Sequence, residues 1–445
     1  MVFVQVLDKL GHMNMNRDSR QKIILLGLIL IIAVCVFLPS LRFGFTNWDD
    51  PDLIIQNDSI KKLNLHNIAQ IFSQSYIGLG GYTPLVLVSY AINYRFSKLD
   101  PNAYHGNNLA IHLLNIILVF FIIWRLSGSH FITFFTTLVF AIHPMNIEAI
   151  VWIQGRKDLL FSFFYFLGIL AYLRYLRSSQ KVLFFTLTTV FFILSLFSKI
   201  IAISFPLILF LLDYVESGDH QLKELKKKLY FFLISAVFLV ISLTTAPLIQ
   251  LSGVPENHFL LSVLRFFYAP FFYIGKAFIP IALSARYSNR LILQAPTVLI
   301  SFIFSSLFIT FTFIFKKKFN NQIVLFSFSL FLITLLPSMI FNTAGMPYSD
   351  RYFYIPAIWI FYIFAWAFYY FFNLKSRFSR IIRIGLIALL MIIITGLSVE
   401  TRKHLRVWGD NILLWTDVIK NNPEESLAYN NRGDAYFANI NWKKR

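Results

Sequence analysis

Cysteine and charged residues are scarce in this sequence of 445 residues. Its one cysteine, Cys35, excludes a disulfide within the chain and a cysteine-rich metal site. Charged residues make up 14% of the chain, whereas a soluble domain has about a quarter. Acids are the scarcer sign, with 21 Asp and Glu against 40 Lys and Arg and a formal net charge of +19.

The distribution of this positive charge argues against nucleic acid as a partner. The basic residues lie largely in short segments between apolar runs. The positive-inside rule of membrane proteins places Lys and Arg in such segments, where they face anionic lipid. We therefore expect the lipid bilayer, and no nucleic acid, to be the partner of these charges.

Hydrophobic residues make up 57% of the chain, including 51 Phe. They are grouped in runs that match the roughly 20 apolar residues a helix needs to cross a bilayer. Helices are required because backbone groups in lipid must bond within their own segment, and a barrel would need short alternating stretches. We predict an all-α, polytopic transmembrane bundle of about 11–13 helices.

The predicted spans are 22–41, 107–125, 131–143, 158–176, 181–198, 200–214, 229–247, 295–315, 322–341, 352–372 and 381–399. Two further stretches, 82–97 and 263–283, are ambiguous. The second contains Pro270 and Pro280, and a re-entrant or interfacial element is favoured there because it keeps the later basic segments inside. The alternative is a full crossing with a local violation of the charge rule.

The N-terminus carries a basic patch ending at Lys22, followed by an apolar run, 23–38, that is longer than the core of a signal peptide. We therefore expect a retained first helix with a cytoplasmic N-terminus. The predicted domains are a cytoplasmic segment (1–21), a transmembrane domain (22–400) with an outer loop (42–106), and an extracytoplasmic C-terminal segment (401–445).

This topology gathers three polar segments on the outer side, namely 46–81, 143–158 and 342–351. The C-terminal segment ends on the same side. Because unusual polar residues of a membrane protein are rarely placed without a role, we expect the functional site at this face.

The first candidate residues are the adjacent acids Asp49 and Asp50, which follow the first span. Acids beside a membrane helix often act as a base, a metal ligand or a proton carrier, and a carboxylate can take the proton of an attacking hydroxyl. A solvated turn before Pro51 explains the same two residues equally well.

The second candidate segment runs from His143 to Asp158. His143 and Glu148 lie at a helix end, and Arg156, Lys157 and Asp158 begin the next span. A metal pair of His143 and Glu148 is the weaker interpretation, because their spacing matches no recognised zinc motif. Basic residues outside argue for an anionic ligand, and snorkelling to the interface is the alternative.

The third candidate is Arg351, at the mouth of a helix beside Tyr352. An arginine there can hold a phosphate through two parallel hydrogen bonds. Asp350 is its alternative partner, and the tyrosines also fit an interfacial belt. Lys199 is either a further phosphate ligand or a loop residue between two helices. Helix packing is favoured for His105.

The tail from Val407 is polar and helical in pattern. The stretch that begins at Ser426 has the spacing of a tetratricopeptide helix, with Gly433 and Tyr436 at typical positions. One such repeat cannot bury its own apolar face. Either the polypeptide is truncated or the tail packs on something else.

These motifs together resemble a known family. They are Asn47-Trp-Asp-Asp, Tyr104-His-Gly-Asn-Asn-Leu, the segment from His143-Pro to Gly155-Arg-Lys-Asp, Asp350-Arg-Tyr-Phe-Tyr-Ile-Pro, and the tetratricopeptide-like tail. The set is similar to the transmembrane and tetratricopeptide-repeat O-mannosyltransferases and their bacterial relatives. That family usually has Glu-Arg-Tyr where this chain has Asp350-Arg351-Tyr352.

The resemblance implies a C-type glycosyltransferase fold and a donor sugar carried on polyprenyl phosphate. It implies that Asp49 or Asp50 is the general base, and that the sugar passes with inversion to an acceptor hydroxyl of a protein or glycan. Arg351, with Arg156, Lys157 or Lys199, would hold the phosphate, and Glu148 would orient the base or bind the sugar. The sequence specifies no cofactor, and a divalent cation stays open.

Two other function classes compete with this expectation. A transporter or flippase for lipid-linked sugars would place its coupling acids near mid-bilayer, and a non-catalytic scaffold would need no paired acids. A bacterial inner membrane is favoured over the endoplasmic reticulum.

Overall fold

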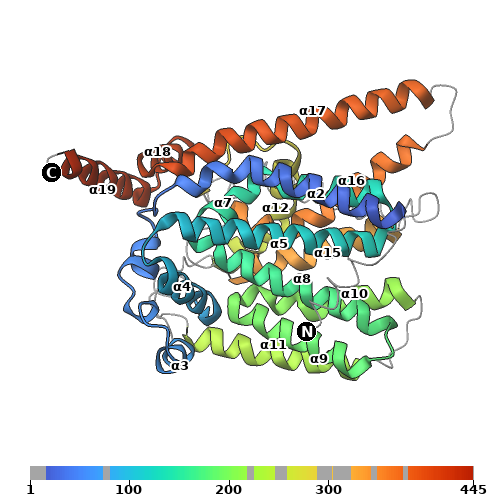
Figure 1. The fold of residues 1–445 in the computed structure, drawn as a ribbon, viewed down its shortest axis with the longest axis horizontal. Helices are drawn as coiled ribbons and strands as arrows, with labels where there is room; N and C mark the ends of the chain where they lie inside the picture. Colours follow the sequence, from blue (N-terminus) through green and yellow to red (C-terminus); the bar gives the residue numbers. More distant parts are fainter. Residues whose placement is uncertain are drawn as a thin grey trace.

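The computed structural model describes residues 17–73, 81–217, 225–245, 258–287, 303, 322–341, 348–373 and 379–443, and every regular element in these ranges is a helix. Long helices run side by side along the longest axis of the molecule (Figure 1). Within these ranges, seven helices are long and apolar enough to cross a membrane, or eight if a helix pair bent by 52° is counted as one span. The chain is an integral, multi-pass membrane protein, and the all-α prediction is confirmed.

The long helices have the following bounds: α2 Arg17–Phe37, α5 Pro101–Ser127, α6 His130–Ile142, α8 Arg156–Arg177, α9 Lys181–Ser198, α10 Phe205–Ser217, α11 Leu225–Thr245, α12 His258–Phe278, α15 Gln322–Phe341, α16 Pro356–Phe372 and α17 Ser379–Leu405. Local sequence sets both ends of α5. Asp100 caps α5 by accepting a hydrogen bond from the Asn102 N–H, and Pro101 occupies its first turn. Gly128, in the left-handed region at φ 60°, ends α5.

The spans predicted from hydropathy coincide with observed helices over most of the chain. The seven long helices, the bent pair α6–α7 and two shorter apolar helices, 200–213 and 356–372, account for ten of the eleven predicted spans. The remaining one, 295–315, lies outside the described residues apart from Ile303.

The two ambiguous stretches behave differently from the spans. Helix α4, Pro84–Ser97, has 14 residues, which is too short to cross about 30 Å of hydrocarbon. Helix α12 contains Pro270 and is not among the seven long apolar helices of the described part of the chain. A re-entrant or interfacial role for α12 stays a prediction.

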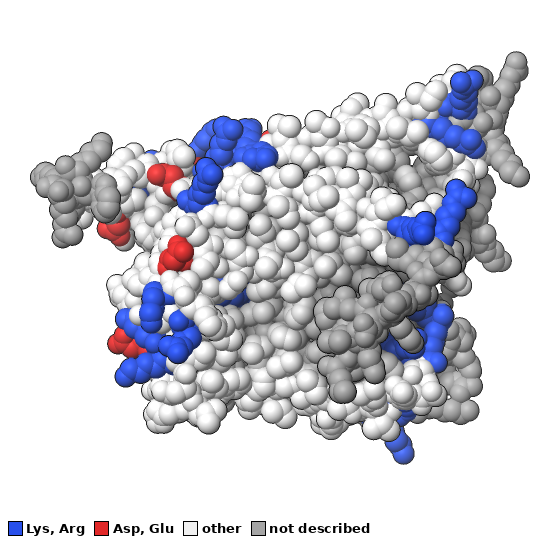
Figure 2. Space-filling model, viewed as in Figure 1, with Lys and Arg blue, Asp and Glu red and all other residues white. Residues whose placement is uncertain are grey.

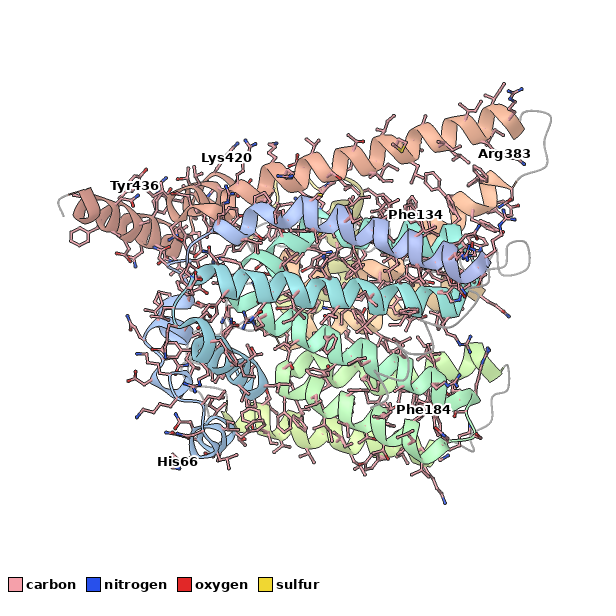
Figure 3. All side chains as sticks on the ribbon, in the orientation of Figure 1. His66, Phe134, Phe184, Arg383, Lys420 and Tyr436 are labelled. Carbon is pink, nitrogen blue, oxygen red and sulfur yellow. The ribbon has the colours of Figure 1, made fainter. Side chains whose placement is uncertain are left out.

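One end of the bundle holds the short elements. They are the 3₁₀ helices η1 Leu38–Arg42, η3 Asp58–Ile60, η4 Pro144–Asn146, η5 Ile153–Gly155, η6 Ile200–Ser204, η10 Asp350–Phe353 and η11 Arg406–Gly409, the π-helix η2 Pro51–Ile55, and the α-helices α3 Leu65–Ser73, α7 Ile147–Val151, α18 Asn411–Asn421 and α19 Ser426–Lys443. Figure 3 places His66 and Tyr436 at this end and Arg383 at the opposite one. On the face drawn in Figure 2, Lys and Arg gather at the two ends, with a broad white belt between them.

The tail forms a pair of helices that folds back on the bundle. Asp410 caps α18 by accepting from the Leu413 N–H at 2.9 Å. The pair contacts the loop after η1, where the Trp415 indole donates to Asn47 Oδ1 at 2.7 Å. The tail therefore packs on another part of the molecule.

Candidate active site

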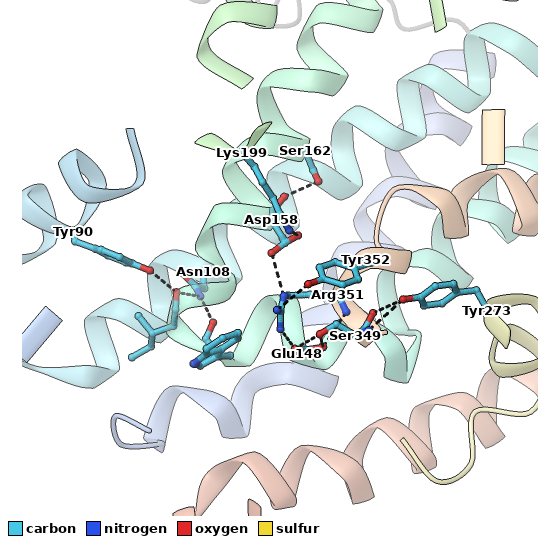
Figure 4. A network of polar contacts seen from close by, with 12 residues as sticks. Tyr90, Asn108, Glu148, Asp158, Ser162, Lys199, Tyr273, Ser349, Arg351 and Tyr352 are labelled. Carbon is cyan, nitrogen blue, oxygen red and sulfur yellow. Dashed lines mark hydrogen bonds and ion pairs between the residues drawn. The ribbon is translucent and has the colours of Figure 1, made fainter. Parts of the chain in front are cut away.

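Two segments far apart in the sequence meet at this end of the bundle. The Arg351 guanidinium in η10 forms an ion pair with Glu148 in α7, and both side chains are buried. Glu148 Oε2 also accepts the Arg351 backbone N–H at 3.1 Å, and Ser349 Oγ donates to Oε1 at 2.8 Å. Figure 4 shows this network. Because a buried carboxylate must be paired and hydrogen-bonded, these contacts fix Glu148 and Arg351 as one unit.

A second ion pair lies beside the first. Lys199, between α9 and η6, pairs with Asp158 Oδ1 in the first turn of α8. Asp158 Oδ2 lies 4.0 Å from Arg351 Nε, and neither of these buried atoms has a hydrogen-bond partner among the described residues. Buried polar atoms without partners are uncommon in folded proteins. Their position between two charged pairs is suited to a polar ligand.

Lys157 is the third cation of the group. Its ammonium lies 5.8 Å from the ring centre of Trp152, and the Arg351 guanidinium lies 5.0 Å from the same ring. Among the described residues, no hydrogen bond or ion pair is formed by Lys157. Lys157 is therefore a cation that is free to bind an anion, whereas Lys199 and Arg351 are already paired.

The two adjacent aspartates differ in their surroundings. Asp50 is fully buried, and its Oδ2 accepts the Thr46 N–H at 2.7 Å and the Thr46 hydroxyl at 2.9 Å. Asp49 lies in the fields of Lys157 and Arg351 and is hydrogen-bonded by Gln154. Asp49 thus faces the cations, while Asp50 holds its own loop together.

Burial sets the protonation of both acids. Desolvation raises the pKa of Asp50 from 3.8 to about 7, against the opposing effect of the Thr46 hydrogen bonds. Desolvation also raises the pKa of Asp49, and the charges of Lys157 and Arg351 oppose that rise. Both carboxyls therefore titrate above the ordinary range of an aspartate, where a group can accept a proton near neutral pH.

The raised pKa of Asp50 predicts that Asp50→Asn makes the protein more stable at alkaline pH. Below pH 3.8 the folded and unfolded states both hold the proton, so the pKa shift costs nothing there. As the pH rises through about 7, the wild type must ionise a buried carboxyl or keep a proton that the unfolded chain has lost. We expect the melting temperature of the variant to exceed that of the wild type at pH 8 and the gap to close by pH 4. An equal gap at both pH values would contradict the assignment.

Arg156 lies outside the cation group. Its Nε donates to Asn108 Oδ1 at 2.8 Å and its Nη2 to the Tyr104 carbonyl at 2.9 Å, while Nη1 donates to Asn93. The guanidinium lies 4.7 Å from the ring centre of Tyr90. With these donors engaged, Arg156 joins α4, α5 and α8 and is not available for a ligand.

The remaining predicted site residues also have structural partners. His143 Nε2 contacts the Ala277 carbonyl at 3.1 Å, and His105 Nε2 contacts the Gly44 carbonyl at 3.3 Å. Asp350 accepts from the Tyr287 hydroxyl at 2.7 Å, so Arg351 takes Glu148 rather than Asp350 as its partner. Burial and the charge of Glu148 raise the pKa of Asp350.

The structure does not bring His143 and Glu148 together as a pair of metal ligands. The two side chains bond to different groups, Ala277 and Arg351. Within the described ranges, no group of three His, Cys, Asp or Glu side chains is placed to hold a metal ion.

Several residues of the site are not evident from sequence patterns. Ser349 and Trp152 contact Glu148 and Arg351 directly. Gly155 lies where an added Cβ would approach the Ala149 carbonyl oxygen to 2.4 Å, so only glycine lets η5 pack against α7. The sequence signal for this contact is the glycine itself, because glycine serves where backbone must approach closely.

Comparison with known proteins supports the resemblance expected from the motifs. Protein O-mannosyl-transferase TMTC3 of Homo sapiens is 27% identical over 155 residues, which is 33% of this chain and 16% of the relative. Protein O-mannosyl-transferase tmtc2 of Xenopus laevis is 36% identical over 94 residues, or 21% of this chain and 11% of the relative. The chain resembles the protein O-mannosyltransferases. The aligned part spans less than a fifth of the length of these relatives, and no family model matches the chain.

A solved structure aligns with a larger share of the chain. The crystal structure of ArnT from Cupriavidus metallidurans bound to undecaprenyl phosphate covers 88% of this chain and 76% of its own, with 13% identity and a TM-score of 0.42. The apo form of the same protein gives a TM-score of 0.38.

Proposed function

We propose that the protein is a membrane glycosyltransferase that moves a sugar from a polyprenyl-phosphate donor to an acceptor hydroxyl. The observation that carries the proposal is the placement of one buried acid, Asp49, in the field of Lys157 and Arg351 at one end of the bundle. A sugar-phosphate donor needs this arrangement, because a base must face the acceptor and cations must face the leaving phosphate.

The donor phosphate is assigned to the three cations Lys157, Arg351 and Lys199. Lys157 has no competing partner among the described residues, and Arg351 Nε is a buried donor without a hydrogen bond. Asp158 and Glu148 keep Lys199 and Arg351 in place through the two ion pairs. A phosphate that replaces part of these interactions gains charge-assisted hydrogen bonds in a site shielded from water.

The lipid tail of the donor is assigned to the helices beside Arg351. The lining of a small pocket there includes the charged residues Asp158 and Arg351 and the apolar residues Phe161, Ile201 and Ile355. Asp158 and Phe161 belong to α8, Ile201 to η6 and Arg351 to η10, and Ile355 is the residue before α16. Charged and apolar side chains therefore meet beside Arg351, and a polyprenyl phosphate needs both kinds of surface.

The chemistry follows from these positions. Asp49 removes the proton of the acceptor hydroxyl, and the oxygen forms a bond to the anomeric carbon. The bond from that carbon to the phosphate oxygen breaks, and its electron pair remains on the phosphate. Lys157, Arg351 and Lys199 stabilise the charge that grows on the leaving group. Attack opposite to the leaving group inverts the anomeric configuration.

The comparisons suggest the acceptor and the fold family. The names of the relatives describe them as O-mannosyltransferases of proteins, so a Ser or Thr hydroxyl is the proposed acceptor. We assign a C-type glycosyltransferase fold on the same basis. The end of the bundle that holds Asp49 is proposed to face the extracytoplasmic side, with the bacterial inner membrane as the location.

A flippase for lipid-linked sugars is the second candidate. Such a protein is expected to carry coupling acids near mid-bilayer at broken helices. Here Asp49 precedes η2 and Glu148 lies in α7, among the short elements at the end of the bundle, which favours the transferase.

The experiment is an assay of the purified full chain in lipid nanodiscs. It uses polyprenyl-phosphate mannose with a labelled sugar and a Ser/Thr-rich peptide as the acceptor. We expect label in the peptide and free polyprenyl phosphate in equal amounts. Movement of the labelled lipid across reconstituted vesicles without release of polyprenyl phosphate would support the flippase instead.

A further inference from the structure

The loop that carries Asp49 is held by the tail. Trp48 stacks on Trp152 with ring centres 4.5 Å apart and an interplanar angle of 17°. On another side, Trp415 of α18 meets Trp48 edge-on at 5.3 Å. Trp152 and Trp415 are both buried. Trp48 is therefore enclosed between a ring of the bundle and a ring of the tail.

Hydrogen bonds add to this contact at the preceding residue. The Asn47 N–H donates to Asn411 Oδ1 at 3.1 Å, and Asn47 Nδ2 donates to the Asn431 carbonyl at 2.7 Å. Asn47 Oδ1 accepts from the Trp415 indole at 2.7 Å. The backbone N–H and both side-chain groups of Asn47 are thus bonded to residues of α18 and α19.

The tail has two further contacts, one with the segment after α12 and one with Phe43 at the start of the loop. Glu425, between α18 and α19, forms an ion pair of 3.0 Å with Arg286, which follows α12. Gly409 lies so close to Phe43 that an added Cβ would be 2.8 Å from the ring. The tail is therefore anchored independently of Trp48, and it can transmit its own position to the loop.

We propose that the tail helices α18 and α19 position Asp49 for catalysis by clamping the adjacent residues Asn47 and Trp48. The proposal rests on the proposed function, in which Asp49 is the base. The contacts run from Trp415 to Trp48 and Trp152, and from Trp152 to the cations Arg351 and Lys157. One cluster of three indole rings thus sets the base and the phosphate ligands relative to each other.

The physical reason is the sensitivity of the reaction to geometry. A loop outside the helices is free to sample many conformations, and ordering it costs free energy for each residue. A displacement of about 1 Å of a catalytic group lowers the rate by ~100-fold. Trp415 and Asn47 act through Asp49, so they are positioning residues and do not touch the reacting atoms.

Trp415→Ala tests the proposal, with Phe437→Ala as the matched control. Phe437 is an aromatic residue of the same tail, and it is 68% exposed. We expect Trp415→Ala to lower kcat by ~10–100-fold with the KM for the donor unchanged within about twofold. The acid limb of the pH–rate profile should move to lower pH, because a freed loop exposes Asp49 and removes the desolvation that raises its pKa. Phe437→Ala should match the wild type.

Two further measurements distinguish loss of the clamp from misfolding of the variant and from failure of the proposed function. Trp415→Phe keeps a ring against Trp48 but loses the bond to Asn47, so we expect an intermediate kcat. Hydrogen exchange of residues 44–50 needs no activity and should be faster in Trp415→Ala than in Phe437→Ala. Equal exchange in the two variants, or an unchanged kcat and acid limb in Trp415→Ala, would overturn the clamp. Faster exchange with no transfer by the wild type would support the clamp and reject the proposed function.

Discussion

Replacement of Asp49 by Asn is expected to lower the rate of sugar transfer by about 10²–10⁴-fold, which is the range that general-base catalysis supplies. Asn keeps the size of the side chain but cannot take a proton. The phosphate cations are unchanged, so donor binding should persist. The measurement is kcat with a labelled polyprenyl-phosphate sugar, together with the dissociation constant of the donor from fluorescence or calorimetry.

Asp50→Asn is the matched control for this prediction. It makes the same chemical change at the neighbouring position, where the side chain bonds to Thr46. We expect it to retain transfer, because the amide oxygen of Asn can still accept the Thr46 N–H. If Asp50→Asn abolished transfer and Asp49→Asn did not, the roles of the two acids would be reversed.

Replacement of Arg351 by Gln is expected to have two large effects. Loss of a donor to the charge that develops on the phosphate should lower kcat by about 10²–10³-fold. The change also leaves Glu148 buried without its cation, and breaking a buried pair costs roughly 3–5 kcal/mol of stability. We expect a lower melting temperature and a lower kcat in the same variant.

The double variant Glu148→Gln with Arg351→Gln separates these effects. Two neutral amides can hydrogen-bond to each other, so no charge is left unpaired and stability should largely return. Transfer should stay low, because the phosphate still lacks its arginine. Arg402→Gln, at an exposed arginine near the same end of the bundle, controls for a general loss of positive charge. Recovery of transfer in the double variant would show that Arg351 serves stability alone.

The positions of the helices could be predicted from the sequence, because a single physical demand governs them. Each span must be apolar over the thickness of the bilayer and must bond its own backbone. Counting spans then places alternate loops on the same side, so the meeting of Asp49, Glu148 and Arg351 at one end followed from the hydropathy pattern. The stretch that forms α4 was ambiguous, because an apolar segment of 14 residues can also pack on the end of a bundle.

The partners within the site could not be predicted, since they depend on the rotation of each helix. Arg156, Lys157 and Asp158 are consecutive in α8, and successive residues of a helix point about 100° apart. Asp158 therefore meets Lys199, Lys157 faces Trp152, and Arg156 turns toward Asn108. The sequence shows three charged residues, while only the packed structure shows which of them share a cavity.

The role of the tail was also beyond sequence analysis. The repeat-like spacing predicts a helix from Ser426, which is observed as α19, and the helical pattern before it is observed as α18. Their contact with the loop at Asn47 and Trp48 joins residues more than 360 positions apart, with a separation of 368 for Asn47 and Trp415. No periodicity along the chain encodes such a pairing.

The most direct test of the account is a cryo-electron microscopy structure of the Asp49→Asn variant with a polyprenyl-phosphate sugar bound. We predict density for the phosphate within hydrogen-bonding distance of Lys157 and Arg351, with the sugar between the phosphate and residue 49. A phosphate bound at the opposite end of the bundle, or separated from residue 49 by packed helices, would contradict it.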